Sequence, residues 1–460
     1  MRGLPIGYSE KWERLRYETR VRGSKRPGES SAILMAPARS GKGTDILVPM
    51  LLEWEGSCIV LDPKGQLACI TAHHRRKRLK QDVLILNPFN VWPEFIGDLP
   101  HIGLNPLDTL DTISEGYGVE TDSLAEGVVI EKPGERDSHF PETAQQVVSG
   151  TIMVVAADAP PAKRNLGTVY EIISGPGFFD FCKDALRKGD PLINGRLGRF
   201  ATAGAMDSRE FMSVQSSAIT NCKFMGNHAI LRSLAGAAKG QRSLDWKSLR
   251  TRATTVYLIL PVRHLQPCAR WLRLMLASAL NRLLIEDKKG LPILMMMDEF
   301  AALNRLEVIE NSMALSAGMG LTMLPVVQDA GQLKELYGER MQSFLSIAGC
   351  QIFFGPRDMY TATLISDLSG QGEVIAQSRS VIIDPQTGEP RVTDSANQQA
   401  RKVLLPDEVM ALGRDEMLMR IENVPDMIRA KRRPYYESSE YRGMWGPDPY
   451  HMEGRRKGWW

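Results

Sequence analysis

The sequence predicts an α/β protein built on a parallel sheet, with an all-helical region inserted into it. Three observations support this fold class. Short apolar runs bounded by turn residues recur, helical patterns separate several of them, and residues 115–240 contain helical patterns without a strand-like run. Apolar strands that alternate with helices are typical of parallel sheets covered on both faces.

Seven runs have the length and composition of buried strands. They lie at 33–36, 58–62, 83–87, 255–261, 293–298, 321–328 and 350–356. Helical patterns follow the first, fourth and fifth of them, at 44–54, 269–287 and 305–318. Such pairs favour a parallel sheet because a crossover segment must bring each new strand alongside the last.

Two regions differ from this alternation. In 115–240 apolar residues recur at a spacing close to 3.6, for example in 141–159 and 208–225, which predicts an all-α insertion. Residues 374–443 predict hairpins, because a Pro-Gln-Thr-Gly turn separates β-prone flanks there.

Composition restricts the class of protein. The chain has 460 residues, 43% of them hydrophobic, and six cysteines without paired spacing. A chain of this length can build a core without disulfides, so these values favour a reducing cytoplasm. No apolar run approaches the ~20 residues of a membrane-spanning helix. The N-terminus also lacks the apolar segment of a signal peptide.

The charge is small overall but uneven along the chain. The net charge is +3, yet residues 1–30 carry eight Lys or Arg against four Glu. Further basic runs lie at 75–80, 429–433 and 455–457. Such runs can neutralise phosphate backbones, although a solvated surface is the commoner role of any single run.

The stretch APARSGKG at 36–43 has the form of a phosphate-binding loop with two departures. Ala36 replaces the first glycine, and Gly43 replaces the hydroxyl residue after Lys42. A predicted strand before the loop and a helix after it supply the context that phosphate binding needs. We expect the loop to bind ATP, with Lys42 at the β- and γ-phosphates, through Ala38, Arg39, Ser40, Gly41, Lys42, Gly43 and Thr44.

Magnesium needs another ligand, because the hydroxyl that normally holds Mg²⁺ is missing at Gly43. Thr44 serves only if the helix start is shifted, and an acidic residue elsewhere is the alternative. Asp298 ends an apolar strand and is placed to hold Mg²⁺ through water, while Glu299 is placed to polarise the attacking water. Alone, this pair is equally explained by a strand with acidic end residues. Together with the loop, it favours ATP hydrolysis.

Asp62 and Lys64 follow another strand, at a sheet edge where α/β proteins place ligand contacts. A buried ion pair explains them equally well. Both interpretations remain open.

These motifs resemble those of the type IV secretion coupling proteins, the TraG/TraD-like conjugation ATPases. The resemblance extends from about 30 to 437 and rests on the loop and on LDPKGQL (61–67), MMDEFAAL (296–303), GMGLTMLPVVQDAGQLKELYG (318–338) and CQIFFGPRDMYTATLISDLSG (350–370). A glycine after the loop lysine is common in this family, so the resemblance implies a working variant of the loop.

The resemblance implies a RecA-like P-loop domain with an inserted all-α domain, assembled as a homo-hexamer at the inner membrane. It implies a Walker A role for Lys42, Walker B roles for Asp298 and Glu299, and a γ-phosphate sensor at Gln328. It also implies an arginine finger at Arg357 that reaches the nucleotide of a neighbouring subunit. The implied partners are a relaxase–DNA complex or secreted effector proteins, and the components of a type IV secretion channel. DNA binding is expected to be independent of sequence, because no base-reading motif is present.

The expected organisation divides the chain into five parts. They are a basic N-terminal segment (1–30), the first part of the nucleotide-binding domain (31–114), the inserted substrate-recognition domain (115–240), the second part of the nucleotide-binding domain (241–443) and a C-terminal tail (444–460). Most family members carry N-terminal membrane helices, and this chain shows none. A shortened chain, a natively soluble member and a peripheral member explain this difference, and the opening MRGLPIGYSEKW favours the second. We expect a cytoplasmic protein, peripheral at the inner membrane.

Two other functions remain open at this stage. One is a receptor scaffold that recruits secretion substrates without hydrolysis, with ATP stabilising assembly alone. The other is a RecA-like DNA translocase unrelated to secretion. Glu299 and Arg357 favour a hydrolysing coupling protein over the receptor.

Overall fold

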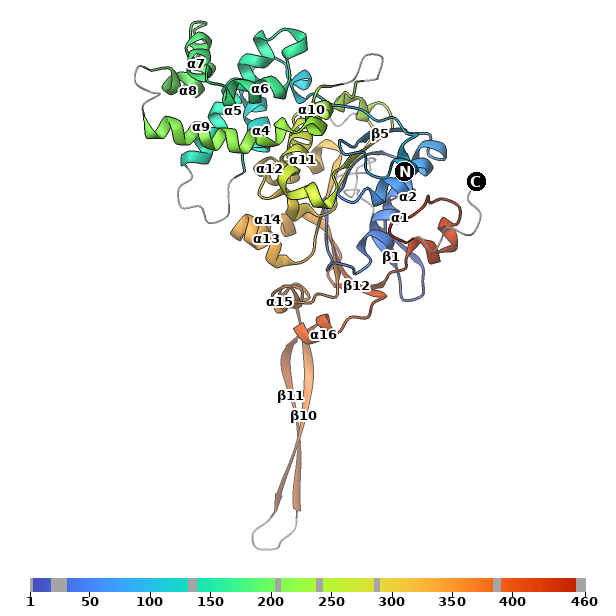
Figure 1. Ribbon diagram of the computed structural model, residues 1–460. Coiled ribbons are helices and arrows are strands. Elements are labelled where there is room, and N and C mark those ends of the chain that lie inside the picture. The colour runs from blue at the N-terminus through green and yellow to red at the C-terminus, as the bar shows by residue number, and fades with distance from the viewer. Residues whose placement is uncertain are drawn as a thin grey trace.

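The computed structural model describes residues 3–17, 31–130, 139–202, 208–236, 243–284, 290–383 and 390–451. Within these ranges the chain forms an eleven-stranded sheet, a two-stranded ribbon and helices that cover the sheet (Figure 1). The strand order in the large sheet is β2-β1-β13-β12-β9-β3-β8-β7-β4-β6-β5.

The seven predicted strands form one continuous parallel block of this sheet. They are β3 (Ser31–Met35), β4 (Ser57–Asp62), β5 (Asp82–Leu86), β6 (Thr254–Ile259), β7 (Ile293–Met297), β8 (Leu321–Val327) and β9 (Ala348–Phe354). Nearly every residue in them is buried, which explains why each reads as a continuous apolar run. The predicted parallel sheet is therefore confirmed.

Four antiparallel strands extend the sheet beyond β9. They are β1 (Leu4–Tyr8), β2 (Arg14–Tyr17), β12 (Glu416–Ile421) and β13 (Ile428–Lys431). Part of the predicted basic N-terminal segment thus belongs to the sheet, which the sequence did not indicate. The reason is the composition of β1, Leu-Pro-Ile-Gly-Tyr, since Pro and Gly are depleted in strands. Residues 18–30 of that segment lie outside the described part of the chain.

Helices pack on both faces of the parallel block. Alternate residues of β3 point to opposite faces, so Ile33 and Met35 join one buried apolar cluster while Ala32 and Leu34 join the other. The second cluster contains α1 (Val48–Glu53) and α2 (Gln66–Lys77). The first contains residues of α11 (Val262–Leu283), α12 (Glu307–Ser316), α13 (Ala330–Tyr337), α14 (Met341–Ile347) and α15 (Met359–Leu368). Two shorter helices are α3 (Pro93–Ile96) and α16 (Pro406–Met410).

The chain between β5 and β6 is helical and gathers at one end of the molecule (Figure 1). Its helices are α4 (Tyr117–Val128), α5 (His139–Asp158), α6 (Leu166–Ser174), α7 (Phe178–Leu186), α8 (Pro191–Leu197), α9 (Arg209–Cys222) and α10 (His228–Leu234). No strand lies among the described residues from 117 to 234. The predicted helical insertion is present, and we call it the helical domain.

The ribbon projects from the body on the side away from the helical domain (Figure 1). It pairs β10 (Gln371–Ile383) with β11 (Pro390–Lys402) in one unbroken register, from Gln371 opposite Lys402 to Ile383 opposite Pro390. The predicted hairpin is confirmed, although its Pro-Gln-Thr-Gly turn lies outside the described residues.

The described part of the predicted C-terminal tail packs on α2. Gly446 N donates to Ile70 O at 2.7 Å, and Gln66 Nε2 donates to the Asp448 carboxylate at 3.0 Å. Across the described ranges, none of the helices combines the length and the apolar character that crossing a membrane requires.

Candidate nucleotide site

The predicted phosphate-binding loop lies between β3 and a π-helical turn, Gly43–Leu47, that leads into α1. Ala36 N donates to Val327 O at 2.9 Å and fixes the start of the loop to β8. Ala36 is not among the residues with positive φ, so a side chain is tolerated where the usual loop has glycine. Gly41 does need to be glycine, because its φ is +94° and a Cβ there would lie 2.9 Å from Asp45 Oδ2.

Four of the predicted site residues meet beside this loop. Lys42 Nζ lies 3.3 Å from Asp298 Oδ1 and 3.1 Å from Glu299 Oε1. Gln328 Nε2 donates to Glu299 Oε2 at 2.9 Å. The topology explains why they meet. The strands β3, β8 and β7 are neighbours in the sheet, and their carboxyl ends lie at the same edge. We call these four residues the Lys42 cluster.

The surroundings of the Lys42 cluster favour the charged forms of Lys42 and Glu299. Burial lowers the pKa of Lys42, but the adjacent Asp298 and Glu299 carboxylates outweigh burial and hold this pKa above its ordinary value. Burial raises the pKa of Glu299, but Lys42 and the hydrogen bond from Gln328 outweigh it and keep this pKa below its usual range. Glu299 is therefore an anion at neutral pH, in the protonation state that can accept a proton from water.

Asp298 differs from its neighbour. It is 7% exposed, and burial raises its pKa despite the attraction of Lys42. Its Oδ1 atom also accepts a hydrogen bond from Glu299 N at 3.1 Å. Glu299 adopts φ +57°, an unusual conformation for a residue with a side chain, and it begins the 3₁₀ turn Phe300–Leu303. Such local strain concentrates at functional sites, where the surrounding structure maintains it.

An arginine that the sequence did not single out holds the loop from the other side. Arg432, which follows β13, donates to Asp45 Oδ2 at 2.6 Å and also to Ser40 O. Its guanidinium lies 3.9 Å from the centre of the Phe354 ring. Burial raises the pKa of Asp45 in spite of the hydrogen bond from Thr44 and the charge of Arg432. The pair is 387 residues apart, so no local motif reveals it.

A cavity of about 780 Å³ opens beside the loop. It is lined by Arg39, Ser40, Gly41 and Thr44 from the loop, together with Arg357 and residues 410, 412–415, 432–434, 436 and 437. Arg357 is exposed, and it makes no hydrogen bond or ion pair with the Lys42 cluster among the described residues. The cavity therefore places Arg357 beside the loop of its own chain, apart from the Lys42 cluster.

The loop has an unsatisfied polar atom, which fits a phosphate site. Ser40 Oγ is buried and has no hydrogen-bond partner among the described residues. Buried hydroxyl groups normally have partners, so a buried hydroxyl without one, at a loop of this shape, fits an anionic ligand.

The predicted metal ligands, Thr44 and Asp298, do not meet in the described part of the chain. The Thr44 hydroxyl lies 3.0 Å from Gly41 O and 2.6 Å from Asp45 Oδ1, and the described chain shows no contact between Thr44 and Asp298. Their metal roles stay predictions.

Asp62 takes a role that neither sequence interpretation included. Its Oδ2 atom accepts a hydrogen bond from Ala68 N at 2.8 Å, at the start of α2. Burial raises the pKa of Asp62 to about 7, and the nearby Asp298 carboxylate adds to this effect. The charge of Lys64 favours the ionised forms of Asp298 and Glu299, although burial outweighs it at Asp298 and raises the pKa of that carboxyl.

Some residues of the basic runs are occupied by contacts within the chain. Arg75 is 0% exposed and bonds to Thr255, Leu51 O and Gln81. In 429–433, Lys431 pairs with Asp415 and Glu416, and Arg433 stacks over the Trp12 ring. Residues 76–78 remain exposed, whereas 455–457 lie outside the described residues.

Comparisons with known proteins agree with this geometry. A sequence profile of the family described as "Type IV secretory system Conjugative DNA transfer" matches residues 15–448. The protein VirD4 of Rhizobium radiobacter is 25% identical over 415 residues, covering 88% of this chain and 55% of VirD4. The conjugal transfer protein TraG of Escherichia coli is 26% identical over 377 residues, covering 76% of this chain and 56% of TraG. The chain thus spans a little over half the length of these relatives.

The fold is also similar to that of a solved coupling protein. The bacterial conjugative coupling protein TrwBΔN70 aligns with a TM-score of 0.67 and 14% identity, covering 94% of this chain and 93% of that one. The predicted fold class, a RecA-like domain with an inserted all-α domain, is confirmed by this likeness. The profile match extends over nearly the whole chain, and the chain therefore belongs to the type IV secretory system conjugative DNA transfer family.

Proposed function

We propose that this protein is an ATP-hydrolysing coupling protein that recruits a relaxase–DNA complex or secreted proteins and delivers them to a type IV secretion channel. The observation that carries the proposal is the Lys42 cluster, in which the loop lysine, two adjacent carboxylates and a glutamine meet at one sheet edge. A receptor that only binds nucleotide needs the loop but has no use for an ionised Glu299 held by two partners.

The residues have distinct roles in this proposal. Loop residues 38–44 bind the phosphates of ATP, and Lys42 moves from its carboxylate partners to the β- and γ-phosphates. Asp298 holds Mg²⁺ through water, Glu299 accepts a proton from the attacking water, and Gln328 orients Glu299 while sensing the γ-phosphate. The similar coupling protein TrwB, with a TM-score of 0.65, has been solved with ADP and Mg²⁺, which supports this cofactor pair.

The proposed partners follow from the family. We assign substrate recognition to the helical domain. The protein binds DNA independently of sequence, and it assembles as a homo-hexamer at the cytoplasmic face of the inner membrane. Arg357 is exposed beside the loop, where a subunit interface would place it against a nucleotide. Substrate-stimulated hydrolysis by the purified protein tests the proposal. ATP binding without hydrolysis, with and without DNA, would favour the receptor instead.

DNA binding should weaken steeply with salt and should not depend on sequence. Lys and Arg contacts to phosphates release counterions, so the logarithm of the affinity should fall linearly with the logarithm of the salt concentration. Fluorescence anisotropy with two unrelated duplexes, from 50 to 200 mM salt, measures this slope. For a protein that makes several phosphate contacts we expect a loss of about 10² or more. An affinity that stays flat over this range would indicate a substrate that is protein alone.

A hydroxyl at position 43 should lower the requirement for Mg²⁺. A Cβ at Gly43 would meet no atom within 4 Å, so Gly43→Ser adds the missing hydroxyl without a clash. We expect the Mg²⁺ concentration for half-maximal turnover to fall by about tenfold, the lower end of the effect of supporting groups on metal sites. Gly195→Ser, on α8 of the helical domain with the same open surroundings, is the control. An unchanged Mg²⁺ titration in Gly43→Ser would place the metal away from this position.

A further inference from the structure

Two arginines of α11 hold the end of α4, and one of them also holds the segment that follows Glu299. Arg273 is 1% exposed, and each hydrogen bond described for it goes to a main-chain carbonyl. Its Nε donates to Gly127 O at 3.1 Å, and its Nη2 donates to Glu126 O at 2.6 Å. Its Nη1 donates to Leu303 O at 2.8 Å and also to Arg305 O. One planar guanidinium thus joins two segments that are far apart in sequence.

The first of these segments is the C-terminal end of α4, where helix carbonyls lack partners and carry partial negative charge. An arginine is suited to this place because its five donors lie in a fixed fork and its charge persists in a buried site. Arg270, one turn earlier on α11, adds a contact from its Nε to Val128 O at 2.9 Å. Its Nη2 donates to Asn221 Oδ1 at 2.7 Å, so both hydrogen bonds described for Arg270 go to the helical domain.

The second segment begins at the proposed catalytic base. Ala302 N donates to Glu299 O at 2.9 Å, so the turn that carries Leu303 starts at Glu299 itself. Beyond the turn, Glu307 N donates to the Glu126 carboxylate of α4. The segment that starts at Glu299 is therefore tied to the end of α4 at two places, through Arg273 at Leu303 and Arg305 and through Glu126 at Glu307. A shift of α4 must either move this segment or break these contacts.

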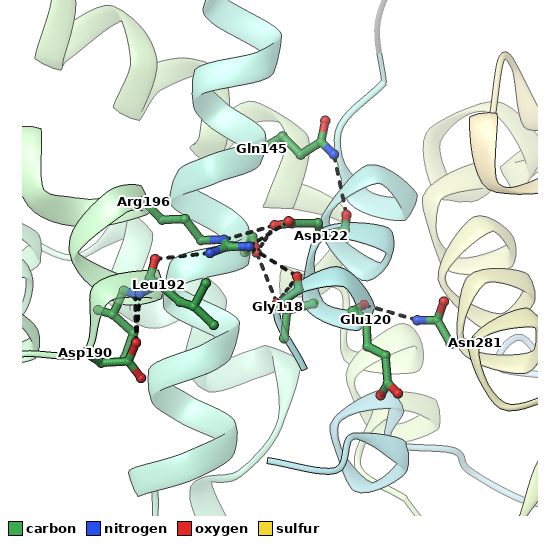
Figure 2. A network of polar contacts seen from close by, with 11 residues as sticks. Gly118, Glu120, Asp122, Gln145, Asp190, Leu192, Arg196 and Asn281 are labelled. Atoms are coloured by element: carbon green, nitrogen blue, oxygen red, sulfur yellow. Dashed lines mark hydrogen bonds and ion pairs between the residues drawn. The ribbon is translucent and has the colours of Figure 1, made fainter. Parts of the chain in front are cut away.

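Helix α4 is in turn fixed to the rest of the helical domain (Figure 2). Arg196 of α8 pairs with Asp122 at 2.6 Å, and Ser149 of α5 donates to the same carboxylate at 2.6 Å. On its other side, Asn281 of α11 donates to Glu120 O at 3.1 Å. Figure 2 shows α4 between these two sets of contacts. A displacement of α5 and α8 therefore reaches α4 directly.

We propose that Arg273 is a positioning residue that couples the helical domain to Glu299, so that substrate engaged by the helical domain sets the geometry of the hydrolytic base. This inference rests on the proposed function for its biological meaning. The coupling itself depends on the contacts of Arg273 with the two segments, so a change of geometry at either segment should reach the other. We therefore expect nucleotide bound at the loop to change the end of α4, even when no hydrolysis occurs.

Hydrogen exchange of the full-length protein, with and without the non-hydrolysable analogue AMP-PNP and Mg²⁺, tests the coupling. We expect the analogue to slow exchange in residues 126–130 of the wild-type protein by about fivefold or more, the lower bound of ordinary coupling between sites. Arg273→Lys keeps the charge but loses the fork, so it cannot hold both segments and should abolish this response. Arg270→Lys, on the same helix, should retain it.

Three outcomes would overturn the inference. They are no response in the wild-type protein, a response that survives in Arg273→Lys, and an equal loss in both lysine variants. The last would indicate that α11 merely stabilises α4, and melting temperatures measured alongside identify a variant that fails to fold. If Arg273→Lys does not fold, Glu126→Ala removes the acceptor of the Glu307 N–H and so tests the second contact between α4 and this segment, and the response must fall in that variant.

A second measurement separates this inference from the proposed function. Arg273→Lys should bind AMP-PNP and DNA as the wild type does, yet its DNA-stimulated turnover should fall to the basal rate, with KM for ATP unchanged. If the wild-type protein binds AMP-PNP but hydrolyses no ATP, the proposed function fails. The exchange experiment still decides the coupling in that case.

Discussion

Glu299→Gln should lower ATP turnover by about 10²–10⁴ while leaving ATP binding intact. Glutamine has the shape of glutamate, and its single amide oxygen can still accept from Lys42, whose Nζ lies 3.1 Å from one carboxylate oxygen. Glutamine can keep a contact with Gln328, now 2.9 Å from the second oxygen, by donating its NH2 group to the Gln328 amide oxygen after that amide turns over. It cannot accept a proton from water, however, because an amide oxygen is a very weak base. The change therefore removes the chemistry and keeps the phosphate cradle, so that ATP should remain bound without being cleaved.

Equilibrium binding and single-turnover hydrolysis measure the two halves of this prediction. Lys42→Ala is the complementary variant, and it should weaken nucleotide binding because it removes the cation that meets the β- and γ-phosphates. Glu335→Gln changes an exposed glutamate of α13 in the same way and should leave both measurements unchanged. Undiminished turnover in Glu299→Gln would show that another group, or water alone, accepts the proton.

Arg357→Ala should bind ATP normally and lose a factor on the order of 10³–10⁵ in the turnover of the assembled protein. The γ-phosphoryl group gains charge in the transition state, and a cation from outside the loop stabilises it. Arg357 is exposed at the cavity beside the loop, so it is available to a nucleotide there. The full assembled rate in Arg357→Ala would return this residue to a structural or DNA-facing role.

Mixing experiments decide whether Arg357 acts on its own subunit or on a neighbour. Arg357→Ala and Lys42→Ala are each expected to be inactive alone. If Arg357 acts on the neighbouring subunit, mixed assemblies contain sites with an intact Lys42 and an intact Arg357, and partial activity should return. If Arg357 acts within its own chain, beside whose loop it lies, no site in the mixture is complete and activity should stay absent.

The sequence was sufficient for the parts of the site that are local in the chain. Lys42, Asp298 and Gln328 each follow a buried strand, and parallel strands bring their carboxyl ends to one edge of the sheet. Strand and loop patterns therefore predicted that Lys42, Asp298 and Glu299 belong to one site, whereas Gln328 was indicated by the family resemblance alone. The departure at Ala36 was also interpretable, because only a positive φ would have required glycine.

Contacts between distant segments were not predictable in the same way. The Arg432–Asp45 pair joins residues 387 apart, and Arg432 lies in a basic run for which a solvated surface was the favoured interpretation. Arg75 was hidden in a similar run, although its environment is fully buried. The distribution of charge along a sequence does not show which charged residues are buried, because the residue type is the same in both environments. The contacts of Arg273 could not be predicted either, because its partners are main-chain carbonyls, which every residue type carries.

The β10–β11 ribbon has a consequence for how this protein can change during evolution. Every rung of the ribbon pairs directly across, from Gln371–Lys402 at the base to Ile383–Pro390 near the tip. Any two facing residues can therefore be joined by a tight turn, and rungs can be gained or lost in pairs without disturbing the pleat. The base stays fixed by ion pairs such as Lys402–Asp367. A change in the length of the projection would thus leave the geometry of the Lys42 cluster unchanged.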